Sequence, residues 1–171
     1  MSETKKIPER KKEKVIGRII VVRVRGECKV KKELEDTLKM LRLYKRNNCV
    51  VVPNKPVFVG MLDKVQNFVT WGELNEQTFK ELIKKRGKLP GKKSLTESYL
   101  KEKTKLDFEN FTKEFFNFKK ELKDVPGLKL FFKLHPPLHG FERKGVKKQF
   151  SMGGALGYRR EKINDLIMRM I

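Results

Sequence analysis

Cysteine and histidine are scarce in this chain, with two residues of each among 171. Cys28 and Cys49 stand at no metal-ligand spacing, and we interpret them as reduced structural thiols rather than as a disulfide. His135 and His139 are four residues apart, but two prolines between them forbid the helix that a metal-binding pair needs at this spacing. Two histidines in one irregular loop give no support for a Ser–His–Asp or Cys–His pair. We therefore predict no metal, no cofactor and no catalytic residue.

Long apolar segments are missing as well. No apolar run reaches the ~18 residues of a membrane-spanning helix, and the N-terminal "MSETKKIPERKKEK" lacks the apolar region of a signal peptide. Binding to an anionic membrane surface would need a basic amphipathic helix with aromatic residues on its apolar side, or a lipidation motif. We expect a soluble, cytoplasmic protein with no membrane partner and no small-molecule substrate.

Acidic residues are few relative to basic ones. Lysine and arginine total 42 against 21 aspartate and glutamate residues, which gives a net charge of +21. Repulsion at this density opposes compaction unless a polyanion neutralises it. Nucleic acid is the usual partner, because each neutralised phosphate releases condensed counterions. Residues 15–72 and 126–171 each carry +7, whereas residues 73–125 carry +4 with mixed signs. Residues 15–72 and 126–171 are therefore predicted to bind the polyanion.

Apolar periodicity predicts a small α/β core after a disordered basic arm at residues 1–14. "VIGRIIVVRVRG" is typical of a strand, with Ile20 and Val22 on one face and Arg23 and Arg25 on the other. A helical stripe follows, then a strand in "NNCVVVPN", a helix that begins near Pro56, and a strand in "NFVTW". This order predicts a β-α-β-α-β unit with its helices on one face of the sheet.

Residues 75–125 have the pattern of a helical extension. "SLTESYLKEKT" begins on Ser94 with Glu97 three residues later, which is the spacing of a capping box. Phenylalanines beside lysines suggest base stacking, but their steps of three and four residues favour a core face; the stripe comprises Phe108, Phe111, Phe115, Phe118 and Leu122. Residues 126–160 are irregular and basic, and "EKINDLIMRMI" closes the chain as a short amphipathic helix.

The glycine-rich "FSMGGALGYRR" at residues 150–160 is typical of a loop that approaches phosphate. It lacks the Gly-Lys-Ser/Thr of a Walker loop, and its glycines break the G-x-G-x-x-G spacing of a dinucleotide site. Glycines admit phosphate close to the backbone, and Arg159 and Arg160 add charge-assisted contacts. We favour a polynucleotide backbone as the ligand; a plain turn and a small-anion site remain open.

A second basic stretch, "LRLYKRNNCVVVPNKP", begins where the first helix is predicted to end. Cations there could simply complement the helix dipole. Together with the basic face of the first strand, they instead favour one continuous edge that contacts phosphates without reading sequence. The edge comprises Arg23, Arg25, Arg42, Lys45, Arg46, Asn47 and Lys55.

The chain resembles a known family at these residues. "LRLYKRNNCVVVPNKPVFVGMLDKVQNFVTWGEL" is similar to the core of the large-subunit ribosomal protein family called L-thirty in bacteria and archaea and L-seven in eukaryotes. Its short bacterial members correspond to residues 15–74. "FKLHPPLHGFERKGVKKQF" and "GGALGYRREKINDLIMRM" resemble the C-terminal part of the longer members, and the brief N-terminus resembles the archaeal ones.

The resemblance implies an α+β fold related to ferredoxin-like proteins: a β-α-β-α-β core at 15–74 with a three-stranded antiparallel sheet, a helical extension at 75–125 and a basic tail at 126–171. It implies a structural, non-enzymatic role in the large ribosomal subunit. The implied partners are 23S-type rRNA, with 5S rRNA nearby, and neighbouring ribosomal proteins. The family often has Arg-Gly where this chain has Leu138 and His139, and a small residue at Arg160. The first departure removes a phosphate contact and the second restores one nearby.

From the tail, we expect rRNA contacts at Lys133, His135, Arg143, Lys144, Lys147, Lys148, Arg159 and Arg160. Two other classes of function stay open. A free-standing RNA chaperone or regulatory RNA binder is one, although the K/R-G-F-G-F-V motif of sheet-stacking RNA domains is missing. An enzyme acting on nucleic acid or an acidic substrate is the other, but it would need converging carboxylates or a metal.

Overall fold

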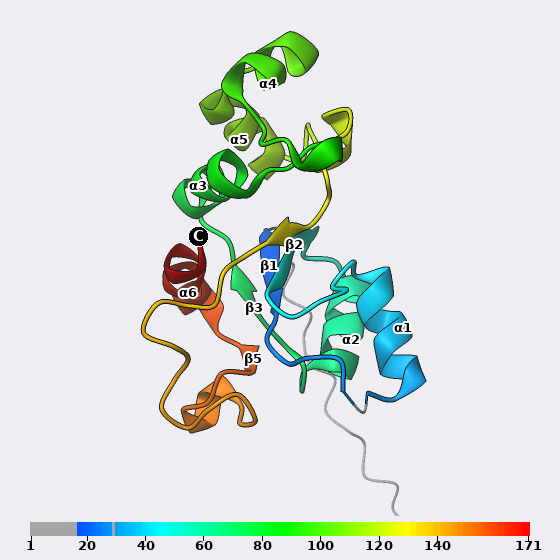
Figure 1. Cartoon of the computed structure of the whole chain (residues 1–171), viewed down its shortest axis with the longest axis vertical. Helices are drawn as coiled ribbons and strands as arrows, with labels where there is room; N and C mark the ends of the chain where they lie inside the picture. Colours follow the sequence, from blue (N-terminus) through cyan, green and yellow to red (C-terminus); the bar gives the residue numbers. More distant parts are fainter. Residues whose placement is uncertain (1–16, 29) are drawn as a thin grey trace, which may run out of the picture.

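The structure is a computed structural model that describes residues 17–28 and 30–171. The basic arm expected at residues 1–14 lies outside the described residues. Figure 1 shows a sheet with helices α1 and α2 on one side, a helical extension above it, and a tail that returns along the other side.

The predicted β-α-β-α-β order is confirmed. Its elements are β1 (Arg18–Arg23), α1 (Lys32–Met40), β2 (Asn48–Pro53), α2 (Pro56–Val65) and β3 (Val69–Glu73). β1 lies in the middle and pairs antiparallel with both β2 and β3. Pro56 opens α2, where a missing N–H costs nothing because the first helical N–H groups have no partner within the helix.

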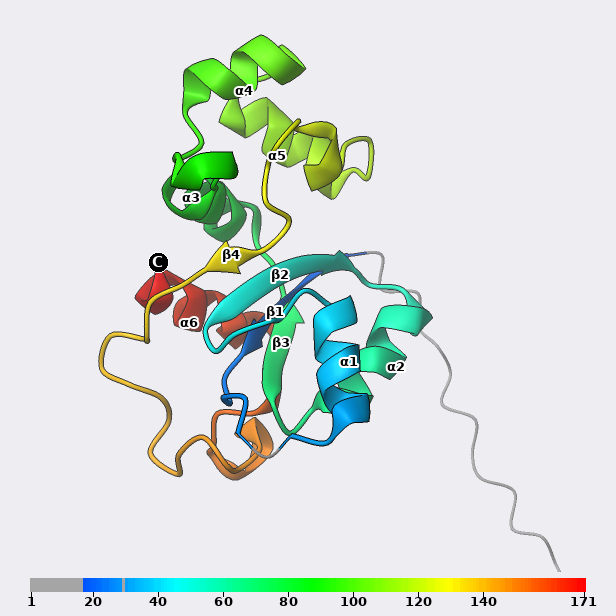
Figure 2. The ribbon, with the colours of Figure 1, turned by 45° about the vertical axis from the view of Figure 1, so that its right-hand side comes forward.

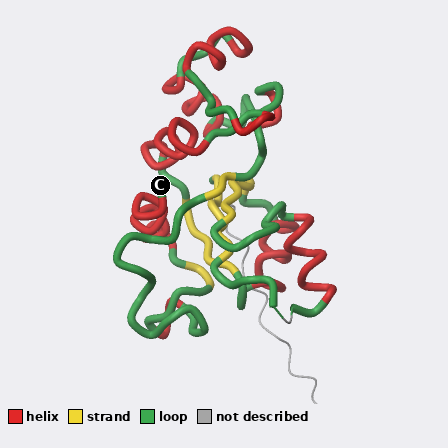
Figure 3. Tube along the Cα trace, in the orientation of Figure 1, coloured by secondary structure: helices red, strands yellow, loops and turns green. Residues whose placement is uncertain are grey.

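The sheet has five strands rather than the three expected. β4 (Phe132–Lys133) pairs antiparallel with β2, and β5 (Gly157–Tyr158) pairs parallel with β3, giving the order β4-β2-β1-β3-β5. Two-residue strands are too short to show an alternating pattern, so sequence reasoning placed both inside an irregular tail. Figure 3 shows the long loops that carry the chain to and from them.

Both faces of the sheet are covered. α1 and α2 lie on one face, as expected, and bury Ile19 and Val21 of β1. The opposite face packs on α3 (Glu76–Arg86) and α6 (Ile163–Met170), as the rotated view in Figure 2 makes visible. β1 is therefore buried on both sides, which explains why its sequence is a continuous apolar run instead of an alternating one.

The extension is helical, and its phenylalanine stripe forms a core face rather than a base-stacking surface. α4 (Glu97–Thr104) and α5 (Phe108–Phe116) follow α3, and the rings of Phe111 and Phe115 are buried. Two details differ from expectation. α5 ends before Phe118, which has φ 59° and is partly exposed. The cap of α4 is Thr96, whose hydroxyl accepts the Tyr99 N–H, and not Ser94.

Short 3-10 turns complete the described elements, at Pro90–Lys92, Leu122–Asp124, Phe150–Met152 and Arg160–Lys162. Residues from the predicted core, extension and tail share one hydrophobic cluster, among them Ile20, Phe111 and Leu166. The division at residues 74 and 125 therefore stays a proposal about the sequence, since packing crosses both boundaries.

A buried arginine ties the extension to the sheet. The Arg18 guanidinium donates to the Phe115 carbonyl at 2.9 Å and to the Lys120 carbonyl at 3.3 Å. It also lies 3.9 Å from the centre of the Phe115 ring. These bonds hold the last turn of α5 and the segment that follows it against β1.

We predict that Arg18→Met lowers the free energy of unfolding by about 3 kcal/mol, because it removes the charged hydrogen bonds to the Phe115 and Lys120 carbonyls. Urea unfolding followed by circular dichroism measures this loss. Arg46→Met is the matched control, since Arg46 is exposed and makes no ion pair with the described residues. Equal stability of the two variants would contradict the structural role given to Arg18.

Candidate nucleic-acid interface

The described cations fall into two groups with different surroundings. In the extension, lysines pair with nearby acids, as in Lys80–Glu109, Lys85–Glu81 and Lys101–Glu97. Ten of the predicted contact residues are exposed, and none of them forms an ion pair with a carboxylate of the described residues. They are Lys45, Arg46, Lys55, Lys133, His135, Arg143, Lys144, Lys147, Lys148 and Arg160. The extension also keeps exposed lysines without an ion pair, such as Lys84 and Lys113, so its positive charge is offset only in part, whereas these ten predicted contact residues have no acidic partner among the described residues.

Arg23 is not part of the exposed surface, contrary to the sequence expectation. It is 1% exposed, and its guanidinium donates to the carbonyls of Leu43 and Tyr44 at 2.8 and 2.7 Å. Its other donors reach the carbonyls of Arg25 and Gly26. Arg23 therefore shapes the turn after α1 from inside and cannot touch a phosphate in this structure.

The turn that Arg23 holds presents exposed cations beside a tail strand. Lys45 and Arg46 lie at its tip, and Asn47 follows with φ 63° and an Oδ1 that accepts no hydrogen bond from the described residues. β4 brings Lys133 opposite Asn48, and the Leu134 N–H donates to the Asn47 carbonyl at 3.0 Å. We call this surface the turn patch; it comprises Lys45, Arg46, Asn47, Lys133 and His135.

The remaining core cations do not extend the turn patch into one continuous edge. Arg42 and Lys55 line a groove of about 360 Å³ between the core and the extension. Arg25 lies at the far end of β1, where its guanidinium stacks 5.0 Å from the Phe68 ring and donates to the Asn67 carbonyl. The predicted edge is therefore divided among three places on the core.

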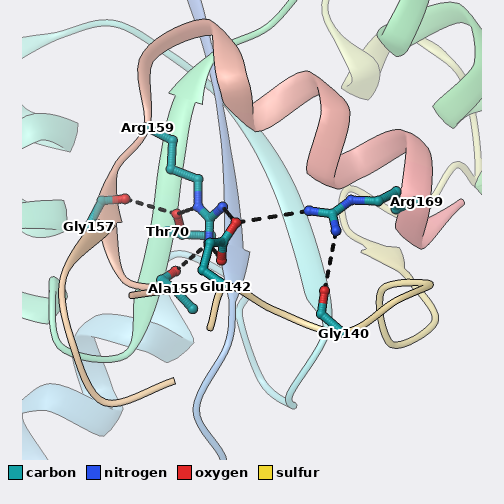
Figure 4. A network of polar contacts seen from close by, with 7 residues as sticks. All are labelled: Thr70, Gly140, Glu142, Ala155, Gly157, Arg159 and Arg169. Carbon is teal, nitrogen blue, oxygen red and sulfur yellow. Dashed lines mark hydrogen bonds and ion pairs between the residues drawn. The ribbon is translucent and has the colours of Figure 1, made fainter. Parts of the chain in front are cut away.

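Arg159 is the second predicted contact that the structure buries. Its side chain is 1% exposed and forms a two-pronged ion pair with Glu142, with one nitrogen–oxygen distance of 2.7 Å. It also donates to the Thr70 hydroxyl on β3 and to the Ala155 carbonyl. Figure 4 shows how this network fixes two tail segments against the sheet. Like Arg23, Arg159 supports the interface from within.

The Arg159 network positions a loop of exposed cations, which we call the basic loop: Arg143, Lys144, Lys147 and Lys148. Arg169 of α6 assists, since its guanidinium lies 3.9 Å from Glu142 and donates to the Gly140 carbonyl. Val146 packs beside the buried Val24 of the core, so the loop lies against the end of β1. The loop therefore presents its charges from a fixed position.

Two glycines of "GGALG" are required by the fold of this region itself, independently of any ligand. A Cβ on Gly154 would lie 2.2 Å from the Lys148 carbonyl, so only glycine permits the close packing of the two loop strands. Gly153 has φ 85° and ends the preceding 3-10 turn. The structure thus gives these two residues a role in loop closure, and the approach of a phosphate to them stays a prediction.

Opposing effects act on the pKa of Glu142. Burial raises it, but the hydrogen bonds from Arg159 and from its own backbone, with the charges of Arg159 and Arg169, outweigh burial and bring the pKa below its ordinary value. Glu142 is thus ionised at neutral pH and compensates the buried guanidinium.

Sequence reasoning missed Glu142, Arg169 and Arg18. Glu142 was the nearest acid to a histidine pair and looked isolated in a basic tail. The one sequence feature that could have pointed to it is the scarcity of acids, because residues 126–171 contain three acidic residues and ten basic ones. Arg18 and Arg169 each stand alone in an apolar segment, and an arginine that such a segment draws inward needs partners for its charge.

The described part of the chain contains no helix long and apolar enough to span a membrane. Within the same residues, no group of three or more metal-ligating side chains is arranged around a common point. His135 and His139 lie in a loop, and His139 has φ 62°.

Comparisons with known proteins agree on one family. The family model described as ribosomal protein L30p/L7e matches residues 19–69. The large ribosomal subunit protein uL30 of Methanopyrus kandleri is 48% identical over 149 residues, which cover 86% of this chain and 100% of the relative. Proteins of the same name from Methanococcus maripaludis and Nanoarchaeum equitans are 50% and 48% identical over 151 residues, or 88% of this chain and 97% of each relative. These matches extend beyond the core into the extension and tail.

We predict that Glu142→Gln destabilises the chain at neutral pH by about 3 kcal/mol, because it leaves the buried Arg159 charge without a counter-ion. The pKa of Glu142 is lower in the folded state, so its contribution is full above the pKa of an unfolded glutamate. It is lost as pH falls through the folded value, which lies below the ordinary pKa of glutamate. Urea unfolding from pH 7 to pH 3 should show the difference between wild type and variant shrinking toward the acid end.

The control for this experiment is Glu109→Gln, which breaks the exposed Lys80–Glu109 pair. Surface pairs contribute little, so this variant should follow wild type across the pH range. A constant gap between wild type and Glu142→Gln down to pH 3 would rule out the ionised pair as its cause.

Proposed function

This chain belongs to the ribosomal protein L30p/L7e family, and on that premise we propose that it is a structural component of the large ribosomal subunit that binds rRNA through its phosphate backbone. It serves as a scaffold protein within the cytoplasmic ribosome, and its role involves no chemical step. The relatives named above are large-subunit proteins of archaea, which agrees with an archaeal-type member of the family.

The observation that carries the proposal is the distribution of free positive charge. Nine exposed lysines and arginines of the core and tail, together with His135, have no acidic partner among the described residues, while five lysines of the extension are paired with acids of the extension. A folded surface with this excess is attracted to phosphates, and each contact gains from counterion release. RNA duplexes offer phosphates and 2′-hydroxyls at regular spacing, so recognition follows backbone shape.

The two surfaces grip two segments of rRNA in this proposal. The turn patch contacts one segment, assisted by Arg25, Arg42 and Lys55 on the core. The basic loop and Arg160 contact a second segment on the other side of the sheet. Arg23 and Arg159 are positioning residues, since each holds a surface loop in shape without reaching the RNA.

The finer partners follow from the same premise. We propose that the RNA is 23S-type rRNA with 5S rRNA in the neighbourhood, and that neighbouring ribosomal proteins complete the surroundings. Leu138 is 69% exposed and offers no charge to a phosphate. Arg160 is exposed before α6, and we assign a phosphate contact to it.

We predict that the double variant Lys147→Gln, Lys148→Gln weakens binding to large-subunit rRNA and lowers the salt slope of log K by about 2, one for each phosphate that the variant no longer neutralises. Filter binding between 50 and 400 mM KCl measures the slope. Lys84→Gln, Lys85→Gln on α3 is the matched control, because it removes the same charge from exposed lysines of the extension.

An equal fall in slope for the two double variants would mean that net charge alone drives binding, and the assigned surface would be wrong. Sedimentation of the full chain with large subunits in moderate salt separates a ribosomal component from a free-standing RNA binder. A chain that binds rRNA fragments but never remains with large subunits would contradict the proposed function.

A further inference from the structure

A cavity of about 1040 Å³ opens at the β5 edge of the sheet, apart from the turn patch and beside the basic loop. Its lining combines residues of three kinds, aromatic, carboxylate and cationic, and includes Trp71, Glu73, Tyr158, Arg160 and Lys162. It is large enough for a nucleotide and open to solvent. Phosphate binding alone would not require an aromatic and acidic lining.

Tyr158 offers a free aromatic surface in this cavity. It is 48% exposed, and its ring lies 6.4 Å from that of Trp71, with a tilt of 34° between them. The neighbouring Phe150 ring is covered by the Arg159 guanidinium at 4.7 Å, so it is already occupied. A base entering the cavity would therefore stack on Tyr158, and such stacking is worth about 1–3 kcal/mol per base.

Glu73 supplies an acceptor that lacks a donor. Its Oε1 accepts the Tyr158 hydroxyl, and its buried Oε2 accepts no hydrogen bond from the described residues. A buried acceptor without a partner is costly, and native proteins rarely retain one without a reason. Burial, together with the hydrogen bond to Glu73 and its negative charge, raises the pKa of Tyr158 to about 12, so the hydroxyl stays a donor and the ring stays neutral.

Cations complete the arrangement. Arg160 and Lys162 lie on the wall that follows β5, and the Lys162 ammonium is 6.0 Å from the Phe150 ring centre. They would meet the phosphate and sugar of a nucleotide whose base points toward Glu73. A carboxylate repels phosphate, so the acidic and basic walls give a nucleotide one favoured orientation.

We propose that this cavity binds one unstacked guanosine nucleotide of the rRNA, with its base on Tyr158 and its Watson–Crick edge donating to Glu73. Guanine presents two adjacent N–H donors on that edge. The Glu73 carboxylate can accept both once its side chain turns to bring the buried Oε2, which has no donor among the described residues, to face the cavity; Oε1 keeps a second lone pair beside the Tyr158 hydroxyl. The inference rests on the proposed function and adds base recognition at one point to binding that otherwise follows the backbone.

Intrinsic fluorescence gives a direct test, because Trp71 is the only tryptophan in the chain and lines the cavity. The full-length protein is titrated with the four ribonucleoside 5′-monophosphates, with free tryptophan derivative correcting for light absorption. We expect GMP to quench at lower concentration than AMP, CMP or UMP. Tyr158→Leu should weaken binding of all four nucleotides.

Glu73→Gln should reduce GMP affinity at least fivefold and remove the preference for GMP, as expected when a paired hydrogen bond to a base edge is removed. Glu161→Gln is the matched control: another carboxylate of the same cavity, with no buried unpartnered oxygen among the described residues. Equal quenching by all four nucleotides, no quenching at all, or the same response from both glutamate variants would overturn the proposal.

This outcome is separable from that of the proposed function. Glu73→Gln leaves the turn patch and the basic loop unchanged, so its salt slope for rRNA and its sedimentation with large subunits should match wild type. Failure of GMP recognition with intact rRNA binding removes the base site alone. Failure of wild type to bind rRNA or large subunits removes the wider function instead.

Discussion

The buried pair between Arg159 and Glu142 is the contact on which the tail's surface depends. Residues 126–171 carry ten basic side chains and three acidic ones, so mutual repulsion favours an open tail. One of those acids is placed under the basic loop, where it neutralises Arg159 and lies near Arg169. Because Arg159 also bonds to Thr70 on β3, the same guanidinium anchors the loop to the sheet. The cations of the loop can then stay exposed without dispersing.

Buried arginines and exposed lysines divide the work throughout the molecule. Arg23 gathers four carbonyls under the turn after α1, and Arg18 gathers two at the end of α5. A guanidinium suits this task because its five donors form a rigid fork and its charge persists when solvent is excluded. A lysine ammonium is hydrated more strongly and suits the wet surface that meets phosphates. Buried arginines therefore stabilise the fold, whereas exposed lysines remain available to a polyanion.

The sequence predicted the elements whose apolar residues recur at a regular local spacing. Apolar periodicity was sufficient for the five core elements, for the phenylalanine face of α5 and for the apolar side of α6. It failed where partners are distant along the chain. β4 and β5 form only because β2 and β3 offer open edges. Arg159 is buried because it packs against β3 and donates to Thr70, a residue 89 positions earlier in the sequence. Charge distribution along the chain identified the basic positions as a set, but a basic side chain looks the same in sequence whether it is buried or free.

The acid at Glu73 has a different meaning from the acids of the extension. Several of those acids pair with lysines and so offset part of the positive charge of the extension. Glu73 instead keeps one oxygen without a donor among the described residues, close to Arg160 and Lys162, where a negative charge weakens attraction for a backbone. Since a carboxylate discriminates against phosphate and in favour of N–H groups, this position changes what the surface selects. A neutral or basic residue there would strengthen binding to any phosphate chain, whereas the acid ties binding at this point to a base.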